Sequence, residues 1–239
     1  MKAMVLCAGF GVRLGEHTRQ TPKPMLRLGN RPLLECIVSH LVRHGFDEIA
    51  VNLHFMPEAI RDYFADGSRC GARLVYSHET ELLGTAGGVR RMAGFLSAGG
   101  DFLVHYGDVV TNQDFTAMLD FHRQHRALAT LLVHRRERSN SVVVLDDEQR
   151  VREFLERPTE EARRGVQSPW VFSGVAICNP QLLDCLPAAV PCDLPRDVFS
   201  GLATTGRLFG FGLTGYRCAV DSPERLAEAQ SAELRGLFQ

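Results

Sequence analysis

Short apolar runs alternate with longer amphipathic stretches through the first half of this chain. Residues 4–6, Met-Val-Leu, form a run of the length that is typical of a strand buried in a parallel sheet. Over residues 32–44 apolar side chains recur every three or four positions and Gly45 follows, which predicts a helix that starts at the proline. The same patterns predict strands at 48–53, 73–77 and 101–105 and helices at 57–64 and 84–95. Strands and helices that alternate at these lengths predict an α/β fold, in which helices flank a mainly parallel sheet.

The second half of the chain has a more mixed pattern. A helix is expected over 115–125, and a polar stretch at 160–166 is expected to be a mobile loop. Runs separated by turns predict an antiparallel addition to the sheet, with strands at 128–134, 141–145, 151–155 and 171–177. The last part is expected to contain short helices at 180–186 and 196–203, strands at 207–213 and 216–220 joined through Thr214-Gly215, and a final helix capped by Ser222 with Leu234 among its buried residues.

Small and basic residues follow the first predicted strand. Ala8, Gly9 and Gly11 carry little or no side chain, so backbone N–H groups there can close on an anion. Arg13 adds a planar guanidinium, whose N–H groups can bind a phosphate in a bidentate manner. Lys23 lies between two prolines, which stiffen the backbone around it. A glycine loop with two nearby cations predicts a site that holds a polyphosphate.

Two familiar phosphate-binding patterns do not fit this stretch. The dinucleotide fingerprint needs a third glycine where this chain has Leu14, and the P-loop pattern is missing. Gly-x-Gly-x-Arg-Leu followed by Pro22-Lys23-Pro24 instead resembles the signature of the sugar-nucleotide pyrophosphorylases, the nucleotidyltransferases that make NDP-sugars. Val12 stands where the family usually has Thr or Ser, but its backbone N–H remains. The resemblance runs in the family's order as far as Asp221, and it implies a Rossmann-like sheet with a small antiparallel sugar-binding addition.

The resemblance also implies a nucleotide site. The segment at 83–87, Leu-Gly-Thr-Ala-Gly, matches the family's L-G-T-A-G closely. Arg13, Lys23 and Asp108 would be the catalytic residues, with Arg13 on the leaving phosphates and Lys23 on the reacting phosphoryl group. The residues implied in nucleotide binding are Ala8, Gly9, Gly11, Val12, Glu79, Gly84 and Thr85.

Two acidic residues would hold Mg²⁺ as the cofactor. Asp108 follows a strand in a Gly-Asp pair, which is where the family places one metal-binding carboxylate. Asp221, ahead of Ser222-Pro223, stands where the family has a D-x-G-T-P pattern. Two carboxylates suit Mg²⁺, which takes its other oxygens from substrate phosphates and water. The alternatives are a plain turn residue for Asp108 and a helix N-terminal acid for Asp221.

Later motifs imply a site for the sugar-1-phosphate. Glu156-Arg157-Pro158 matches the family's Glu-Lys-Pro, whose lysine reaches the sugar phosphate, and Arg157 keeps that charge in a planar fork. Ser173 and Gly174 occupy the family's Asn-x-Gly position, which touches the sugar hydroxyls. The resemblance therefore implies that Glu156, Arg157, Ser173 and Gly174 bind the sugar phosphate.

Within the family, the mannose-1-phosphate guanylyltransferases look closest. The segments 77–79, 83–87, 121–125 and 196–199 all resemble that branch. The implied reaction joins GTP and mannose-1-phosphate into an NDP-sugar and releases pyrophosphate. Uridylyl-, thymidylyl- and heptose-phosphate guanylyltransferases are alternatives, as is an inactive homologue that binds NDP-sugar and regulates a partner. A glycosyltransferase would need a D-x-D motif, which 107–110 does not supply.

Glu79 is a candidate for reading the nucleotide base. Uridylyl relatives have a Gln four residues before the Leu of the L-G-T segment, and Glu79 holds that position before Leu83. An ionised carboxylate only accepts hydrogen bonds, and guanine offers it two adjacent donors where uracil offers one between two carbonyls. The sequence thus predicts a preference for GTP. In the alternative interpretation Glu79 is a solvated acid at a strand end, and backbone groups near Gly84 read the base.

Composition and charge limit the other possibilities. The net charge of −1 gives no expectation of nucleic-acid binding, and no apolar run approaches the length of a membrane span. The seven cysteines are scattered, which is typical of reduced thiols in a cytoplasmic protein. We expect no leader peptide and one nucleotidyltransferase domain over 1–239, with an NTP-binding half at 1–112, a sugar-phosphate-binding half at 113–239 and no C-terminal β-helix. Assembly into a homo-oligomer stays open.

Overall fold

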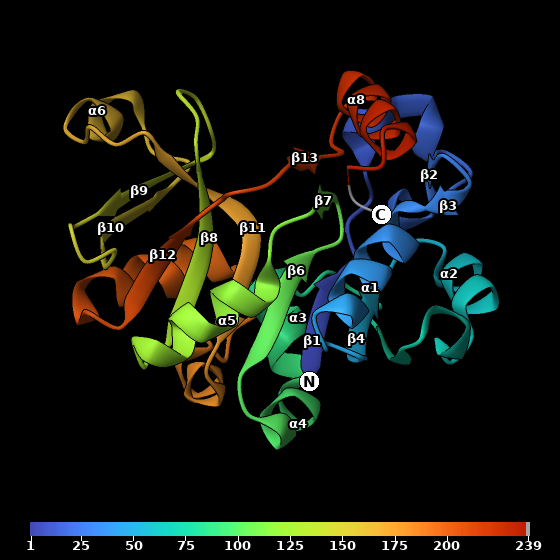
Figure 1. Ribbon diagram of the computed structural model, residues 1–239, viewed down its shortest axis with the longest axis horizontal. Helices are drawn as coiled ribbons and strands as arrows, with labels where there is room; N and C mark the ends of the chain where they lie inside the picture. The colour runs from blue at the N-terminus through green and yellow to red at the C-terminus, as the bar shows by residue number, and fades with distance from the viewer. Residues whose placement is uncertain (238–239) are drawn as a thin grey trace. The chain divides into compact units, whose positions relative to one another are not determined.

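The computed structural model of this chain describes residues 1–237. They form two compact units, each built from separate parts of the chain (Figure 1). The first unit contains residues 1–82, 104–115 and the stretch from Thr214 onward, and the second contains 83–103 and 116–213. The predicted division at residue 112 into two substrate-binding halves stays a prediction.

The first unit is built on a parallel sheet flanked by helices. Its strands are β1 (Lys2–Leu6), β2 (Arg27–Leu28), β3 (Arg31–Pro32), β4 (Glu48–Leu53), β5 (Arg73–His78), the end of β6 (Phe102–Tyr106), β7 (Val109–Thr111) and β13 (Arg217–Ala219), and its helices are α1 (Leu33–Arg43), α2 (Pro57–Phe64) and α8 (Pro223–Leu234). The strand order is β6–β1–β4–β5, and β1 pairs in parallel with β4, as β4 does with β5. Met4 lies opposite Ala50, and both are fully buried. An unbroken apolar strand is what a sheet covered on both faces requires.

The second unit is centred on β8. Its strands are β8 (Ala129–Arg135), β9 (Ser141–Leu145), β10 (Val151–Glu156), β11 (Trp170–Cys178) and β12 (Leu208–Gly212), and its helices are α3 (Gly84–Arg91), α4 (Ala93–Leu96), α5 (Phe115–Gln124, which starts at the end of the first unit's middle segment), α6 (Glu160–Arg164) and α7 (Ser200–Leu202). Strand β8 pairs antiparallel with β11 and parallel with β12, and β9 pairs antiparallel with β10. The buried Met118 and His122 give α5 the inward face that its apolar spacing indicates.

The structure confirms the predicted α/β class, the mainly parallel sheet and the antiparallel addition. Strand β4 and helix α2 have the predicted bounds. Ser222 caps α8 as expected, because its Oγ accepts a hydrogen bond from the backbone N–H of Arg225.

Two expectations were wrong. Residues 160–164 form the short helix α6 rather than a loop, because Thr159 caps them by accepting from the N–H of Ala162. Leu234, expected to be buried, is 81% exposed at the end of α8. The strands expected at 207–213 and 216–220 are present as β12 and β13, and they belong to different sheets, because β12 pairs with β8 and β13 pairs antiparallel with β7.

No helix within residues 1–237 combines the length and the apolar character that a membrane crossing requires.

Candidate active site

The glycine loop leaves β1 under tight steric constraints. The backbone N–H of Cys7 donates to Asn52 Oδ1 at 2.8 Å, which fixes the point where the strand ends. Gly11 has φ of 67°, and a Cβ there would lie 3.1 Å from Thr18 Cγ2 and 3.2 Å from Lys23 Cβ. A side chain at Gly11 would therefore strain the backbone and press on Lys23 at once. The 3-10 turn over 12–18, which carries Val12 and Arg13, begins at this glycine.

Lys23 and Asp108 form a short ion pair. Lys23 Nζ lies 2.8 Å from Asp108 Oδ2, and the Lys23 side chain is only 12% exposed. Lys23 opens a 3-10 turn that contains Pro24, and its carbonyl accepts from the N–H of Leu26, so its backbone is held on both sides. A shielded ion pair with a fixed backbone is a pre-organised charge, as a phosphoryl-transfer site needs.

Gly107 explains how Asp108 comes so close to β1. A Cβ on Gly107 would lie 2.5 Å from Cys7 Sγ and 2.7 Å from the carbonyl oxygen of Leu6. The Gly107 N–H donates to that same carbonyl at 2.9 Å. Burial, helped by the nearby Asp108 carboxylate, raises the pKa of the Cys7 thiol and keeps it protonated. Cys7 therefore fills space beside Gly107.

The second cation and the second carboxylate also pair with each other. Arg13 Nη1 lies 3.1 Å from Asp221 Oδ2. The N–H of Val220 donates to the carbonyl of Asp108 at 2.7 Å, so the backbones that carry the two carboxylates are joined directly. Strand β13, which leads to Asp221, pairs with β7, which follows Asp108. Within the first unit, the structure thus brings together the two predicted cations and the two predicted metal ligands.

The two carboxylates fit Mg²⁺ better than a metal that needs a full protein cage. Among residues 1–237 no group of three or more histidine, cysteine or acidic side chains is placed to hold a metal ion. Mg²⁺ commonly takes one or two protein carboxylates and completes its octahedron with phosphate oxygens and water. Asp108 and Asp221 would supply that donor set.

Glu79 belongs to a buried hydrogen-bond chain. Its side chain is 1% exposed, and its Oε1 accepts from Asn52 Nδ2 at 2.8 Å. Asn52 in turn accepts from the N–H of Cys7, so Glu79 is tied to the start of the glycine loop. We did not predict a role for Asn52. A polar residue inside the apolar run of β4 is the signal that could have revealed it.

In the second unit, the L-G-T-A-G segment lies against residues 192–194. Gly84 has φ of 76°, and a Cβ there would overlap the backbone of Cys192, lying 2.8 Å from its carbonyl carbon. Thr85 donates from its N–H and from Oγ1 to Asp193 Oδ1, at 3.1 and 3.2 Å. These contacts give Gly84 and Thr85 partners inside the protein. Their roles in nucleotide binding stay predictions.

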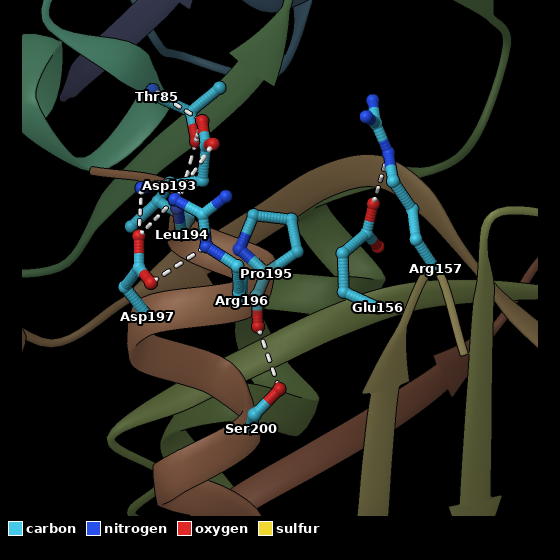
Figure 2. Close-up of polar contacts among 9 residues, drawn as sticks. All are labelled: Thr85, Glu156, Arg157, Asp193, Leu194, Pro195, Arg196, Asp197 and Ser200. Carbon is cyan, nitrogen blue, oxygen red and sulfur yellow. Dashed lines mark hydrogen bonds and ion pairs between the residues drawn. The ribbon is translucent and has the colours of Figure 1, made fainter. Parts of the chain in front are cut away.

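Glu156 and Arg157 stand side by side at the end of β10 (Figure 2). Arg157 Nε lies 3.6 Å from Glu156 Oε1, and the Arg157 side chain is 79% exposed. Arg157 has φ of 47°, an uncommon conformation for a residue other than glycine, and its N–H donates to the carbonyl of Asn140. Partial burial raises the pKa of Glu156, although the Arg157 charge opposes this. A strained backbone that aims a solvent-facing guanidinium is common at functional sites.

Ser173 lies beneath the surface of the second unit. It is fully buried, and its Oγ is 2.8 Å from Nδ1 of His134. Gly174 follows with φ of 84°, where the pairing of β11 with β8 is interrupted between Phe172 and Ala176. The predicted contact of Ser173 with sugar hydroxyls stays a prediction, and His134 joins the candidate residues because it holds that hydroxyl.

Comparison with known proteins defines the class. Residues 2–193 match the family model for nucleotidyl transferases, so the chain belongs to the nucleotidyltransferase family. It is 34% identical over 223 residues to a UTP–glucose-1-phosphate uridylyltransferase of Synechocystis, covering 87% of this chain and 57% of that protein. It is 30% identical over 243 residues to a mannose-1-phosphate guanylyltransferase of Mycobacterium tuberculosis, covering 98% and 65% respectively. The chain thus spans about two thirds or less of the length of these relatives.

Solved structures show the same fold. A UDP-glucose pyrophosphorylase in complex with UDP-glucose superposes with a TM-score of 0.84 at 18% identity, over 98% of each chain. HddC from Yersinia pseudotuberculosis, in complex with GMP-PN, superposes with a TM-score of 0.79 at 18% identity, over 97% of this chain and 99% of that one. At this identity the likeness concerns the architecture alone.

Proposed function

We propose that this chain is a sugar-1-phosphate nucleotidyltransferase that makes an NDP-sugar and pyrophosphate, with GTP and mannose-1-phosphate as its substrates. The single observation that best supports this is the double ion pair of the first unit, Lys23–Asp108 and Arg13–Asp221, joined through the backbone of Val220. Two cations and two acids that lie together in one unit suit the charges of an NTP and its metal ion.

In the proposed mechanism the residues position the substrates and neutralise charge, without a covalent enzyme intermediate. A phosphate oxygen of the sugar-1-phosphate attacks the α-phosphorus of the NTP in line, that P–O bond forms, and the bond to pyrophosphate breaks. Asp108 and Asp221 would hold Mg²⁺, which supplies positive charge to the phosphate oxygens. Lys23 would then contact the reacting phosphoryl group and Arg13 the departing pyrophosphate. Arg157 would hold the phosphate of the attacking sugar-1-phosphate.

The preference for GTP rests on Glu79. Glu79 is 1% exposed and its Oε1 accepts from Asn52 Nδ2, so its side chain would have to turn out of this buried chain before both carboxylate oxygens could face a base. Two adjacent donors of guanine match an ionised carboxylate, whereas uracil would set a carbonyl against one of its oxygens. The Mycobacterium guanylyltransferase relative is consistent with this choice. The Synechocystis uridylyltransferase relative makes UTP with glucose-1-phosphate the second candidate.

The proposal also covers location and assembly. A cytoplasmic location would give the enzyme its NTP, and the scattered spacing of the seven cysteines is typical of reduced thiols there. A homo-oligomer is compatible with this activity, and the mass in solution would decide it.

A substrate grid tests the proposed function. Pyrophosphate release is measured with GTP, UTP, dTTP and ATP, each combined with mannose-1-phosphate and glucose-1-phosphate. We expect the highest kcat/KM for GTP with mannose-1-phosphate, and Lys23→Ala as a control should lose most of that rate. A higher kcat/KM for UTP would overturn the guanylyl assignment. No release with any pair, together with binding of an NDP-sugar, would favour the inactive regulatory homologue.

A further inference from the structure

Residues 192–194 occupy the backbone donors at the start of α3. The carbonyl of Cys192 accepts from the N–H groups of Ala86 and Gly87, at 2.9 and 3.3 Å, and Asp193 Oδ1 accepts from the N–H of Thr85. The first N–H groups of a helix have no partner within the helix, and a nearby side chain or a ligand usually satisfies them. Here residues 192–194, which are distant in the sequence but belong to the same unit, satisfy them. The N–H groups of Thr85, Ala86 and Gly87 are therefore bonded within the protein.

Residues 192–194 also donate hydrogen bonds to the turn at 83–85. The N–H of Cys192 donates to the carbonyl of Leu83 at 2.9 Å, and the N–H of Leu194 donates to Thr85 Oγ1 at 2.8 Å. Thr85 Oγ1 therefore donates to Asp193 and accepts from Leu194 in the same place. Substitution of the hydroxyl by a methyl group would conserve the shape but remove one of the two Thr85 donors to Asp193 Oδ1 and leave the N–H of Leu194 without this acceptor.

Asp193 is fixed from its other side by a charged pair (Figure 2). The Asp193 N–H donates to Asp197 Oδ2 at 2.7 Å. Arg196 binds both oxygens of Asp197 at 2.9 Å, and its Nη2 lies 3.5 Å from Asp193 Oδ2. Hydrogen bonds from Arg196 and from the Asp193 N–H lower the pKa of Asp197, so its carboxylate stays ionised. We call Thr85, Asp193, Arg196 and Asp197 the Asp193 network.

The Asp193 network reaches the candidate sugar-phosphate residues. The segment 194–199, which carries Arg196 and Asp197, packs against β10, because the ring centroids of Phe154 and Phe199 lie 5.9 Å apart. At the end of that strand, besides burial and Arg157, the charges of Asp193 and Arg196 act on the Glu156 carboxylate, the first raising its pKa and the second lowering it. Glu156 stands beside this cluster in Figure 2, with Arg157 next to it. One hydrogen-bonded network in the second unit thus extends from the L-G-T-A-G turn to the neighbourhood of the Glu156–Arg157 pair.

We propose that Thr85 and Asp193 are positioning residues, and that the Asp193 network sets the distance between the turn at 83–85 and the Glu156–Arg157 pair. This rests on the proposed function, in which the first segment lies at the nucleotide and the second holds the sugar phosphate. In-line transfer requires the attacking oxygen and the α-phosphorus to be aligned, and a misplacement of about 1 Å can cost about 10²-fold in rate. In this proposal Thr85 holds the turn at 83–85 in place through its bonds to Asp193 and Leu194, and it does not bind the nucleotide itself.

Kinetics on five variants test the assignment. Thr85→Val and Asp193→Ala should each lower kcat about ten- to a hundredfold with smaller changes in either KM, because alignment is lost rather than binding. Thr85→Ser keeps the hydroxyl and should remain within about threefold of the wild type. Thr205→Val is the matched control, because the Thr205 hydroxyl also joins a backbone carbonyl and a backbone N–H, those of Leu202 and Arg207, in the same unit. The double variant Thr85→Val/Asp193→Ala should be no worse than the worse single variant.

Each other outcome would overturn the assignment. A selective rise in the KM for NTP in Thr85→Val, with Asp193→Ala unaffected, would make Thr85 a nucleotide ligand. Lower melting temperatures with kcat unchanged would make the Asp193 network a purely structural feature. If the wild type released no pyrophosphate, the proposed function would fail, and amide hydrogen exchange would still decide on the network. Asp193→Ala should speed exchange at Thr85, Ala86 and Gly87, and unchanged protection there would show that the network does not hold the turn.

Discussion

Substitution of Gly107 by alanine should damage catalysis through a backbone contact that lies outside the ion pairs. The new Cβ would lie 2.7 Å from the carbonyl oxygen of Leu6, about 0.7 Å inside an ordinary contact of 3.4 Å, and 2.5 Å from Cys7 Sγ. The thiol can rotate away, but the carbonyl belongs to a buried strand and cannot. Overpacking of this kind typically costs about 1–3 kcal/mol.

The backbone shift would be passed to the neighbouring residue, Asp108. Its carboxylate sits 2.8 Å from Lys23 Nζ, and a displacement of several tenths of an ångström would weaken that pair and move a proposed metal ligand. We expect Gly107→Ala to lower kcat by about tenfold or more. The melting temperature should fall by roughly 2–10 °C for a chain of this size.

Two further variants separate the two contacts. Cys7→Ala/Gly107→Ala removes the sulfur but not the carbonyl, so it should regain part of the stability and little of the activity. Gly201→Ala is the control, since a Cβ at that position meets nothing within 4 Å. Pyrophosphate release and thermal melts measure both effects. If Gly107→Ala were as active and as stable as Gly201→Ala, the packing explanation of Gly107 would be refuted.

The remaining predictions concern the charged groups and the base. Asp108→Asn and Asp221→Asn should each lose most turnover with the fold intact by circular dichroism, and EDTA should abolish wild-type activity until Mg²⁺ is restored; full activity in either variant or in EDTA would exclude the metal role. Lys23→Ala should lower kcat by about 10²-fold or more. Arg157→Ala should mainly raise the KM for the sugar phosphate. If Arg157→Ala raised only the KM for NTP, Arg157 would belong to the nucleotide site and not to the sugar-phosphate site. Glu79→Gln should narrow the ratio of kcat/KM for GTP to that for UTP, and an unchanged ratio would remove Glu79 from base recognition.

The architecture of the first unit could be predicted because its signals are local. The unbroken apolar run of β1 and the proline-led helix α2 each carry their own pattern, and a parallel sheet follows from their alternation. The two-residue strands β2 and β3 show no period, and the separation of β12 from β13 depends on partners far away in the sequence.

The candidate site, like the fold, has parts that the sequence could predict and parts that it could not. The motifs around Lys23 and Asp108 could be recognised along the sequence, but their 2.8 Å pairing and the Gly107 packing come from tertiary contacts. The role of Asp193 could not be predicted, because it caps a helix that starts more than a hundred residues earlier. The burial of Ser173 was not predicted, because its place in the family's motif implied contact with sugar hydroxyls, and the irregular pairing of β11 with β8 between Phe172 and Ala176 interrupts the alternation of strand faces there.

The hydrogen bond from Val220 to Asp108 has a consequence for biosynthesis. Strand β7 emerges from the ribosome with Asp108 long before its partner β13 is translated. A nascent chain that ends before β13 holds Lys23 and Asp108 but lacks the second carboxylate. Under the proposed function, such a chain cannot assemble the Mg²⁺ site, so it gains activity only after Asp221 has left the exit tunnel and β13 has paired.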